Sequence, residues 1–218
     1  MIGSCRFSDI TVFSFHPVKT ITTGEGGMAV TNSSGLAEKM GLARSHGITR
    51  SPDLMRRKPD GPWYYEQIDL GYNYRMTDLQ AALGLSQLGR LDEFISKRHR
   101  IAERYDKALA DLPLKLPVCK VKNEKKSGVH LYVVRLELEK IRRSHREVFE
   151  FLREKGIGVN LHYIPVHTQP YYQTLGFCHG DFPEAERYYS EAVSLPLFPD
   201  LSWEMQQKVI DVLAEALD

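Results

Sequence analysis

The sequence predicts an α/β fold in two parts, and three observations support this. Hydrophobic residues make up 42% of the 218 residues and charged residues 26%, which is typical of a chain that buries a core. Near the start, strand patterns flank a glycine-rich turn and are followed by helical patterns. In roughly the last 100 residues, strand and helix patterns alternate, which favours a small domain with helices on one face of a sheet.

The first element predicted is a strand over residues 9–15, which is rich in β-branched and aromatic side chains. Pro17 should end its regular pairing. A glycine-rich turn at 22–27 and a second strand at 28–31 follow. A strand that is buried on both faces needs neighbours, so we expect either later strands or further chain to complete its sheet.

The remaining elements follow from hydrophobic spacing and capping residues. Ser33 or Ser34 can cap a helix at 36–45, and Thr77 with Asp78 can cap another. Residues 47–71 predict a long loop that is functional or lies between subunits. The other predictions are an amphipathic helix at 91–109 with Phe94, Ile95, Ile101, Tyr105 and Leu109 on its buried side, strands at 129–138 and 158–163, and helices at 144–155, 182–194 and 202–217.

Charge and composition exclude several classes of function. Lys and Arg number 29 against 28 Asp and Glu, so no broad attraction for nucleic acid or an anionic membrane is expected. No apolar run approaches the roughly 18 residues of a membrane span, and the start lacks the apolar stretch of a signal peptide. The three cysteines, Cys5, Cys119 and Cys178, are too few and too scattered for a disulfide framework or a metal site. These features predict a soluble, cytoplasmic protein without a metal.

The residues around Lys19 are the most informative for chemistry. Lys19 follows a predicted buried strand and precedes a glycine-rich turn, so its amine should lose water, which favours the neutral, nucleophilic form. Ser14, five residues earlier, offers a hydroxyl to a phosphate. A cofactor that carries both an aldehyde and a phosphate would need both groups. A lone lysine after a strand is more often a surface residue, so the pattern alone leaves both interpretations open.

Several motifs in order extend this pattern over essentially the whole chain. Ser-Phe-His-Pro-Val-Lys at 14–19 is followed by Gly-Glu-Gly-Gly at 24–27, and further motifs lie at 70–82, 162–167 and 195–199. Together they resemble the DegT/DnrJ/EryC1/StrS sugar aminotransferases, which are fold-type I enzymes that use pyridoxal 5′-phosphate (PLP). The resemblance implies that residues 1–88 are the C-terminal part of the PLP-binding large domain and that 89–218 are the small α/β domain.

The resemblance also implies roles for individual residues. Lys19 would form the Schiff base with PLP and then shuttle the proton during amino transfer, and Ser14 would contact the cofactor phosphate. Asn73 matches an asparagine that reaches the cofactor of the neighbouring subunit, which predicts a homodimer with shared active sites. Arg75 would hold the Asn73 loop or an anionic group of the substrate.

Three residues of the predicted small domain are candidate substrate contacts. His162, Tyr163 and His167 lie beside Pro165 in an apolar context. They could contact the substrate, since binding pockets hold few and convergent polar groups. Equally, they could be buried, hydrogen-bonded residues that close the small domain. The sequence leaves this choice open.

The resemblance implies a nucleotide-linked sugar as the substrate and an amino acid, glutamate, as the amino donor. The chain most resembles the branch that aminates C4 of a UDP-linked 4-keto-6-deoxy sugar during pseudaminic acid biosynthesis. The family's aspartate for the pyridine nitrogen has no counterpart upstream of Ser14, so the chain resembles only the C-terminal part of such an enzyme. The alternative is therefore a catalytically silent fragment that only dimerises. A lysine-based aldolase or dehydratase is disfavoured, because the wider motifs do not fit one and family dehydratases carry His at position 19.

Overall fold

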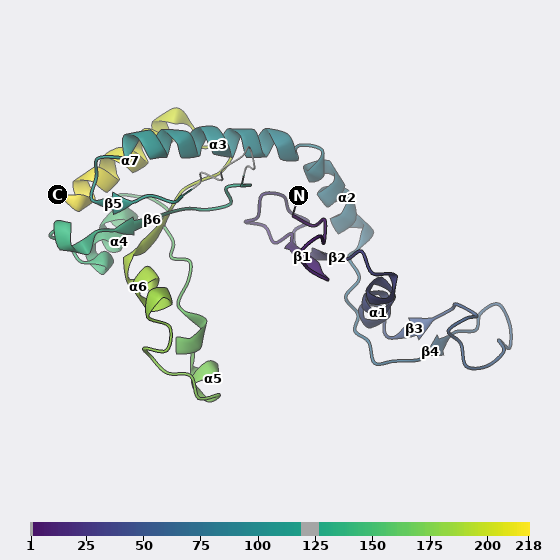
Figure 1. Ribbon diagram of the computed structural model, residues 1–218. Coiled ribbons are helices and arrows are strands. Elements are labelled where there is room, and N and C mark those ends of the chain that lie inside the picture. The colour runs from purple at the N-terminus through teal and green to yellow at the C-terminus, as the bar shows by residue number, and fades with distance from the viewer. Residues whose placement is uncertain (1, 119–126) are drawn as a thin grey trace. The chain divides into compact units, whose positions relative to one another are not determined.

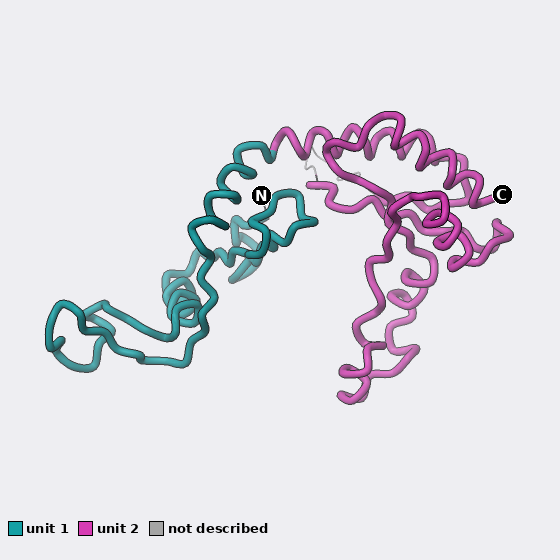
Figure 2. The backbone as a smooth tube through the Cα atoms, turned by 180° about the vertical axis from the view of Figure 1, so that it is seen from behind, with its two compact units in different colours: residues 1–91 teal, residues 92–218 magenta. Residues whose placement is uncertain are grey.

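The computed structural model describes residues 2–118 and 127–218. It divides the chain into two compact units, Met1–Leu91 and Asp92–Asp218 (Figure 2). Cys119 lies outside the described residues. Each unit has its own strands and helices, and each is described by itself below.

Unit 1 is built on a two-stranded antiparallel sheet, labelled in Figure 1. Strand β1 (Thr11–Ser14) pairs with β2 (Gly27–Val30) in a register that places Thr11 opposite Val30 and Ser14 opposite Gly27. Helix α1 (Ser34–Arg44), the short pair β3 (Ile48–Thr49) and β4 (Glu66–Gln67), and helix α2 (Asp78–Leu88) follow. The turn that contains Lys19 connects β1 to β2.

The prediction of a strand buried on both faces at 9–15 is wrong for this chain. Strand β1 has one neighbour, β2, and its side chains alternate between half-buried and exposed. Val12 is 74% exposed, which is unusual for valine in a strand.

Polar side chains fix the starts of both long helices of unit 1, as predicted. Ser33 is the N-cap of α1, and its hydroxyl accepts a hydrogen bond from the backbone N–H of Leu36. Thr77 caps α2 in a capping box with Gln80, whose side chain accepts from the Thr77 backbone N–H in return. The N-cap that fixes the start of α2 therefore lies two residues after Arg75.

Unit 2 packs helices on a three-stranded antiparallel sheet in the order β5-β6-β7 (Figure 1). The strands are β5 (Leu114–Lys115), β6 (Tyr132–Leu136) and β7 (Ala192–Leu195). Helices α3 (Leu91–Ala108), α4 (His145–Glu154) and α7 (Trp203–Leu217) bring their apolar sides to the same core as β6. Four of the five predicted α3 residues are buried, and Ile95 is half-buried.

The other side of β6 faces helix α6 (Pro183–Glu191). There Arg135 of β6 forms an ion pair of 2.6 Å with Glu191, and its guanidinium lies over the Tyr188 ring. The short helices η1 (Leu138–Lys140), η2 (Val166–Thr168) and α5 (Pro170–Gln173) lie in the connections.

Three predicted elements differ from the structure. The predicted strand at 158–163 is wrong: within it only Asn160 makes a β-bridge, to Ser194, and the Asn160 side chain accepts the next backbone N–H. The predicted helix at 182–194 ends at Glu191, because residues 192–195 pair with β6 as a fully buried strand. The loop at 47–71 contains the short antiparallel pair β3–β4.

Candidate active site

The Lys19 turn is closed by hydrogen bonds that converge on Phe15, the residue after β1. The Phe15 backbone N–H donates to Gly26 O (2.9 Å), and the Phe15 carbonyl accepts from the Thr23 backbone N–H (3.1 Å). The Thr22 hydroxyl also donates to Phe15 O (2.9 Å). Residues 16–22 therefore form a closed loop whose two ends are held by β1 and the glycine-rich turn.

Within this loop Lys19 is half-buried. Its backbone N–H donates to His16 O (2.9 Å), which makes a tight turn at the proline. Its amine has no hydrogen-bond or ion-pair partner among the residues that the structure describes. A half-buried amine without a protein partner is available to a ligand, which is what covalent attachment to an aldehyde requires.

Ser14 ends β1 on the same turn, and its side chain is exposed. Its hydroxyl accepts a long hydrogen bond of 3.4 Å from the His16 backbone N–H, which leaves its proton available to an acceptor such as a phosphate oxygen. His16 in turn lies 3.8 Å from the Glu25 carboxylate across the loop. The turn thus presents an amine and a hydroxyl within one short segment.

The Asn73 segment is held against the end of α1. The Tyr72 backbone N–H donates to Ala43 O (2.7 Å), and the Tyr74 backbone N–H donates to Arg44 O (2.9 Å). Gly47 and Gly71 allow this close approach: a Cβ at Gly47 would lie 1.9 Å from Asp69 O, and its φ of +66° is left-handed.

The side chains of Asn73 and Arg75 both point to the surface of the single chain. Neither has a hydrogen-bond or ion-pair partner in the described part of the chain. The rings of Tyr72 and Tyr74, on either side of Asn73, stack with centroids 5.0 Å apart. A backbone held in place, with exposed polar side chains beside a stacked pair of rings, is suited to contact with another molecule.

The candidates of unit 2 lie in the connection between α4 and α6. His162 Nδ1 is 2.7 Å from the hydroxyl of buried Ser194 on β7, and its ring meets the Tyr163 ring edge-on at 4.5 Å. Tyr163 is 66% exposed, so its hydroxyl is accessible. His162 is thus oriented by the sheet, while Tyr163 is open to a ligand.

His167 is buried on η2, and its Nε2 lies 2.7 Å from Glu186 Oε1 of α6. Glu186 also accepts from the Gly180 backbone N–H (2.7 Å) and pairs with His179. The hydrogen bond with His167, followed by that with Gly180, lowers the pKa of the Glu186 carboxyl below its usual value. Sequence reasoning missed Glu186 and Ser194, since no local motif links them to histidines 19 and 32 positions away.

The candidates therefore fall into two groups, one in each unit. In unit 1, Lys19 and Ser14 share one turn, and Asn73 and Arg75 lie in a second segment. In unit 2, one connection carries the other three candidates, His162, Tyr163 and His167.

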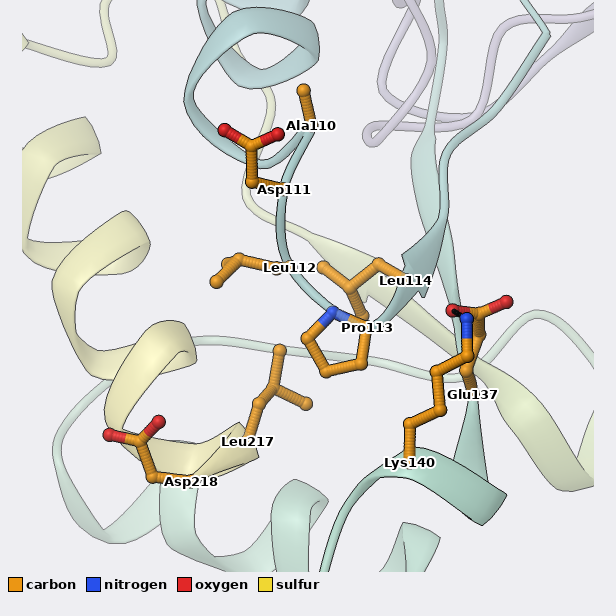
Figure 3. A pocket seen from close by; sticks show the side chains of 9 residues that line it. All are labelled: Ala110, Asp111, Leu112, Pro113, Leu114, Glu137, Lys140, Leu217 and Asp218. Atoms are coloured by element: carbon orange, nitrogen blue, oxygen red, sulfur yellow. Dashed lines mark hydrogen bonds and ion pairs between the residues drawn. The ribbon is translucent and has the colours of Figure 1, made fainter.

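A cavity in unit 2 contains none of these residues (Figure 3). The side chains of Leu112, Pro113, Leu114 and Leu217 line its floor, and Glu137 and Lys140 flank it. Among the described residues no group of three His, Cys, Asp or Glu side chains could hold a metal ion. In the same residues, no helix combines the length and the apolar character needed to cross a bilayer.

Comparison with solved structures defines the class of protein. PseC of Helicobacter pylori, an aminotransferase involved in the biosynthesis of pseudoaminic acid, matches 97% of this chain with a TM-score of 0.86 at 33% identity, over 54% of its own length. Spr1654 of Streptococcus pneumoniae, described as a sugar aminotransferase and solved in a PLP-form, matches 98% with a TM-score of 0.84 at 30% identity, over 53% of its length. The fold is therefore that of part of a PLP-dependent aminotransferase, as the sequence predicted.

The family model for the DegT/DnrJ/EryC1/StrS aminotransferase family matches residues 2–214. The chain belongs to this family, whose aminotransferases depend on PLP. The spore coat polysaccharide biosynthesis protein SpsC of Bacillus subtilis is 40% identical over 99% of this chain and 55% of its own length.

A UDP-4-amino-4,6-dideoxy-N-acetyl-β-L-altrosamine transaminase of Campylobacter jejuni is 36% identical over 97% of this chain and 53% of its own length. The chain thus spans about half the length of the curated relatives that it matches.

Proposed function

We propose that this chain is the Lys19-bearing part of a PLP-dependent sugar aminotransferase. The observation that carries the proposal is the half-buried Lys19 amine, which has no protein partner among the described residues and lies in a turn closed on Phe15. When bound, PLP supplies an aldehyde that condenses with an amine and a ring that accepts electrons from the reacting carbon. The residues of the turn fit this group, because an amine and a serine hydroxyl match its aldehyde and its phosphate.

In this proposal each residue has one task at a stated atom. Lys19 Nζ holds the cofactor and, once substrate has displaced it, carries the proton between the amino-bearing carbon and the cofactor. Ser14 Oγ donates to a phosphate oxygen. The exposed Asn73 amide reaches the cofactor of a second subunit, which makes the functional unit a homodimer, and Arg75 supports that loop or an anionic group.

The substrate we propose is a nucleotide-linked 4-keto-6-deoxy sugar, with glutamate as the amino donor. The C. jejuni relative is named for the aminated form of such a sugar, and PseC is assigned to pseudoaminic acid biosynthesis. Tyr163, with its exposed hydroxyl, and His162, oriented by Ser194, are the proposed sugar contacts. His167, held by its contact with Glu186, lies in the same connection. We propose a cytoplasmic location and a role in surface-glycan synthesis.

Covalent trapping tests the proposal on the chain as it stands. The chain is incubated with PLP, the lysine adducts are fixed with borohydride, and the modified peptides are measured by mass spectrometry. We expect Lys19 to be labelled in preference to Lys39, an exposed lysine of α1, and the label to be lost in Lys19→Ala but kept in Lys39→Ala.

The same experiment separates the two functions that the sequence left open. Because the family's aspartate for the pyridine nitrogen is not in this chain, we expect weak PLP binding and no amino transfer from these 218 residues alone. Equal labelling of Lys19 and Lys39 would contradict the aminotransferase proposal and favour a silent, dimerising fragment. Strong cofactor absorbance that depends on Lys19 would instead contradict the expected weak binding.

A further inference from the structure

The Lys19 turn meets helix α2 through a close contact between Thr23 and Gly84. Thr23 is only 4% exposed, and its Cγ2 methyl faces Gly84 in the middle of α2. A Cβ at Gly84 would lie 2.7 Å from this methyl, which is closer than two non-bonded carbon atoms can approach without a clash. Alanine is the better helix former, so the glycine here is explained by the contact and not by helix stability.

Thr23 is also the residue through which the turn is closed. Its backbone N–H donates to Phe15 O (3.1 Å), and its hydroxyl donates to Glu25 O (2.8 Å). A Cβ at Gly26 would lie 2.3 Å from that hydroxyl oxygen and 2.9 Å from Met76 Cε, just before α2. A shift of Thr23 would therefore move both ends of the loop that holds Lys19.

We propose that Thr23 and Gly84 are positioning residues for Lys19. The contact between the Thr23 methyl and Gly84 sets the distance between the closed turn and α2, and this distance keeps Lys19 half-buried. The inference rests on the proposed function, since it specifies how that lysine is held. Because α2 begins three residues after Arg75, the same helix also joins the Lys19 turn to the Asn73 segment. Neither Thr23 nor Gly84 has a role in the chemistry itself.

The test is Gly84→Ala, with Gly41→Ala as the matched control. Both glycines lie inside helices of unit 1, but a Cβ at Gly41 meets no atom within 4 Å. The readout is the rate of lysine acetylation by dilute acetic anhydride as a function of pH, with Lys39 as the internal reference. At each pH tested, we expect Gly84→Ala to raise the Lys19-to-Lys39 rate ratio toward unity, because the displaced turn exposes the Lys19 side chain to the reagent.

In the borohydride experiment, we expect trapping of PLP on Lys19 in Gly84→Ala to fall by about tenfold or more, since misplacing a reacting group by an ångström can cost roughly 100-fold. Gly41→Ala should leave both readouts unchanged. The double variant Thr23→Ser with Gly84→Ala should restore them, because serine removes the clashing methyl and keeps the hydroxyl that donates to Glu25 O.

Two results would overturn the inference. One is a folded Gly84→Ala protein in which Lys19 acetylation is unchanged. The other is a change in Lys19 acetylation that persists in the double variant, because the alanine would then act through a contact other than the one with the Thr23 methyl. If Gly84→Ala does not fold, Thr23→Ser removes the same methyl contact without a clash, keeps the hydroxyl that donates to Glu25 O, and must raise the Lys19 rate.

The acetylation experiment tests the positioning role and the trapping experiment tests the proposed function, so either claim can fail without the other. If the wild-type chain shows the expected acetylation pattern but no PLP trapping on Lys19, the proposed function fails while the positioning role stands. If Lys19 is trapped but its reactivity is indifferent to Gly84, the positioning role fails while the proposed function stands.

Discussion

Arg98 offers a sharp test of what holds unit 2 together. It lies on α3 and is 4% exposed, and its Nη1 donates to the carbonyls of Val129, His130 and Leu197 at 3.0–3.3 Å. These carbonyls lie just before β6 and just after β7. Because β6 and β7 are antiparallel, with Tyr132 opposite Leu195, one buried guanidinium ties the long helix to both chain segments at the same end of this strand pair.

The substitution Arg98→Met sets two effects against each other. Burial lowers the pKa of Arg98, so removing the charge relieves a desolvation cost. Against this, the backbone carbonyls remain and lose their donor, at a cost of about 1–3 kcal/mol for each one left buried. Because one Nη1 carries two hydrogens, about two such bonds are lost, and the partial relief leaves a net destabilisation of about 2–3 kcal/mol.

The assay is thermal unfolding of the full chain followed by circular dichroism, with urea unfolding as a second measurement. For a unit the size of Asp92–Asp218, 1 kcal/mol shifts Tm by about 4 °C, so we expect Arg98→Met to lower the Tm of the unit 2 transition by about 8–12 °C. Arg100→Met, an exposed arginine of the same helix, is the control and should change stability by less than about 0.5 kcal/mol.

A Tm for Arg98→Met that equals the control's would refute the reasoning. It would mean that the cost of burying the guanidinium matches everything its hydrogen bonds contribute, as happens for some buried ion pairs.

Two further predictions concern unit 2. Because its hydrogen bonds with His167 and Gly180 lower the pKa of Glu186, the folded state releases the Glu186 proton more readily than the unfolded state. Its stabilisation is therefore full above the ordinary value of 4.5 and is lost as pH falls through the lowered pKa. Glu186→Gln should thus be less stable than wild type at pH 7, with a gap in urea midpoint that narrows in acid; a constant gap would contradict this. Ser144→Ala removes the capping box of α4 and should cost about 1 kcal/mol, or about 4 °C in Tm; an unchanged Tm would show that Glu147 alone holds that helix end.

Elements with a local signal could be predicted from the sequence. Thr77 predicts the start of α2, because a threonine hydroxyl can accept a hydrogen bond from a free backbone N–H of the first helical turn. This hydrogen bond is present. The period of Phe94, Ile101 and Tyr105 likewise predicts the buried side of α3. The turn at Lys19 was found through its glycines and its motif, which is local as well.

Other features could not be predicted, because they depend on partners far along the chain. Residues 192–194 continue a helical pattern, yet they pair with β6 because burial on the sheet outweighs helix propensity. The exposure of Val12 depends on which strands lie beside β1, and the partner of His167 is a carboxylate on a later helix.

The order of residues alone thus determined the family and the starts of the best-capped helices, and it predicts the lysine that should react, since each depends on neighbouring positions. Only the tertiary structure decided that the methyl of Thr23 meets a glycine of α2, that the buried Arg98 ties α3 to backbone carbonyls beside β6 and β7, and that Glu186 orients His167. The physical reason is that contacts between distant segments depend on how helices and strands pack, and packing distances are not encoded in any short stretch of sequence.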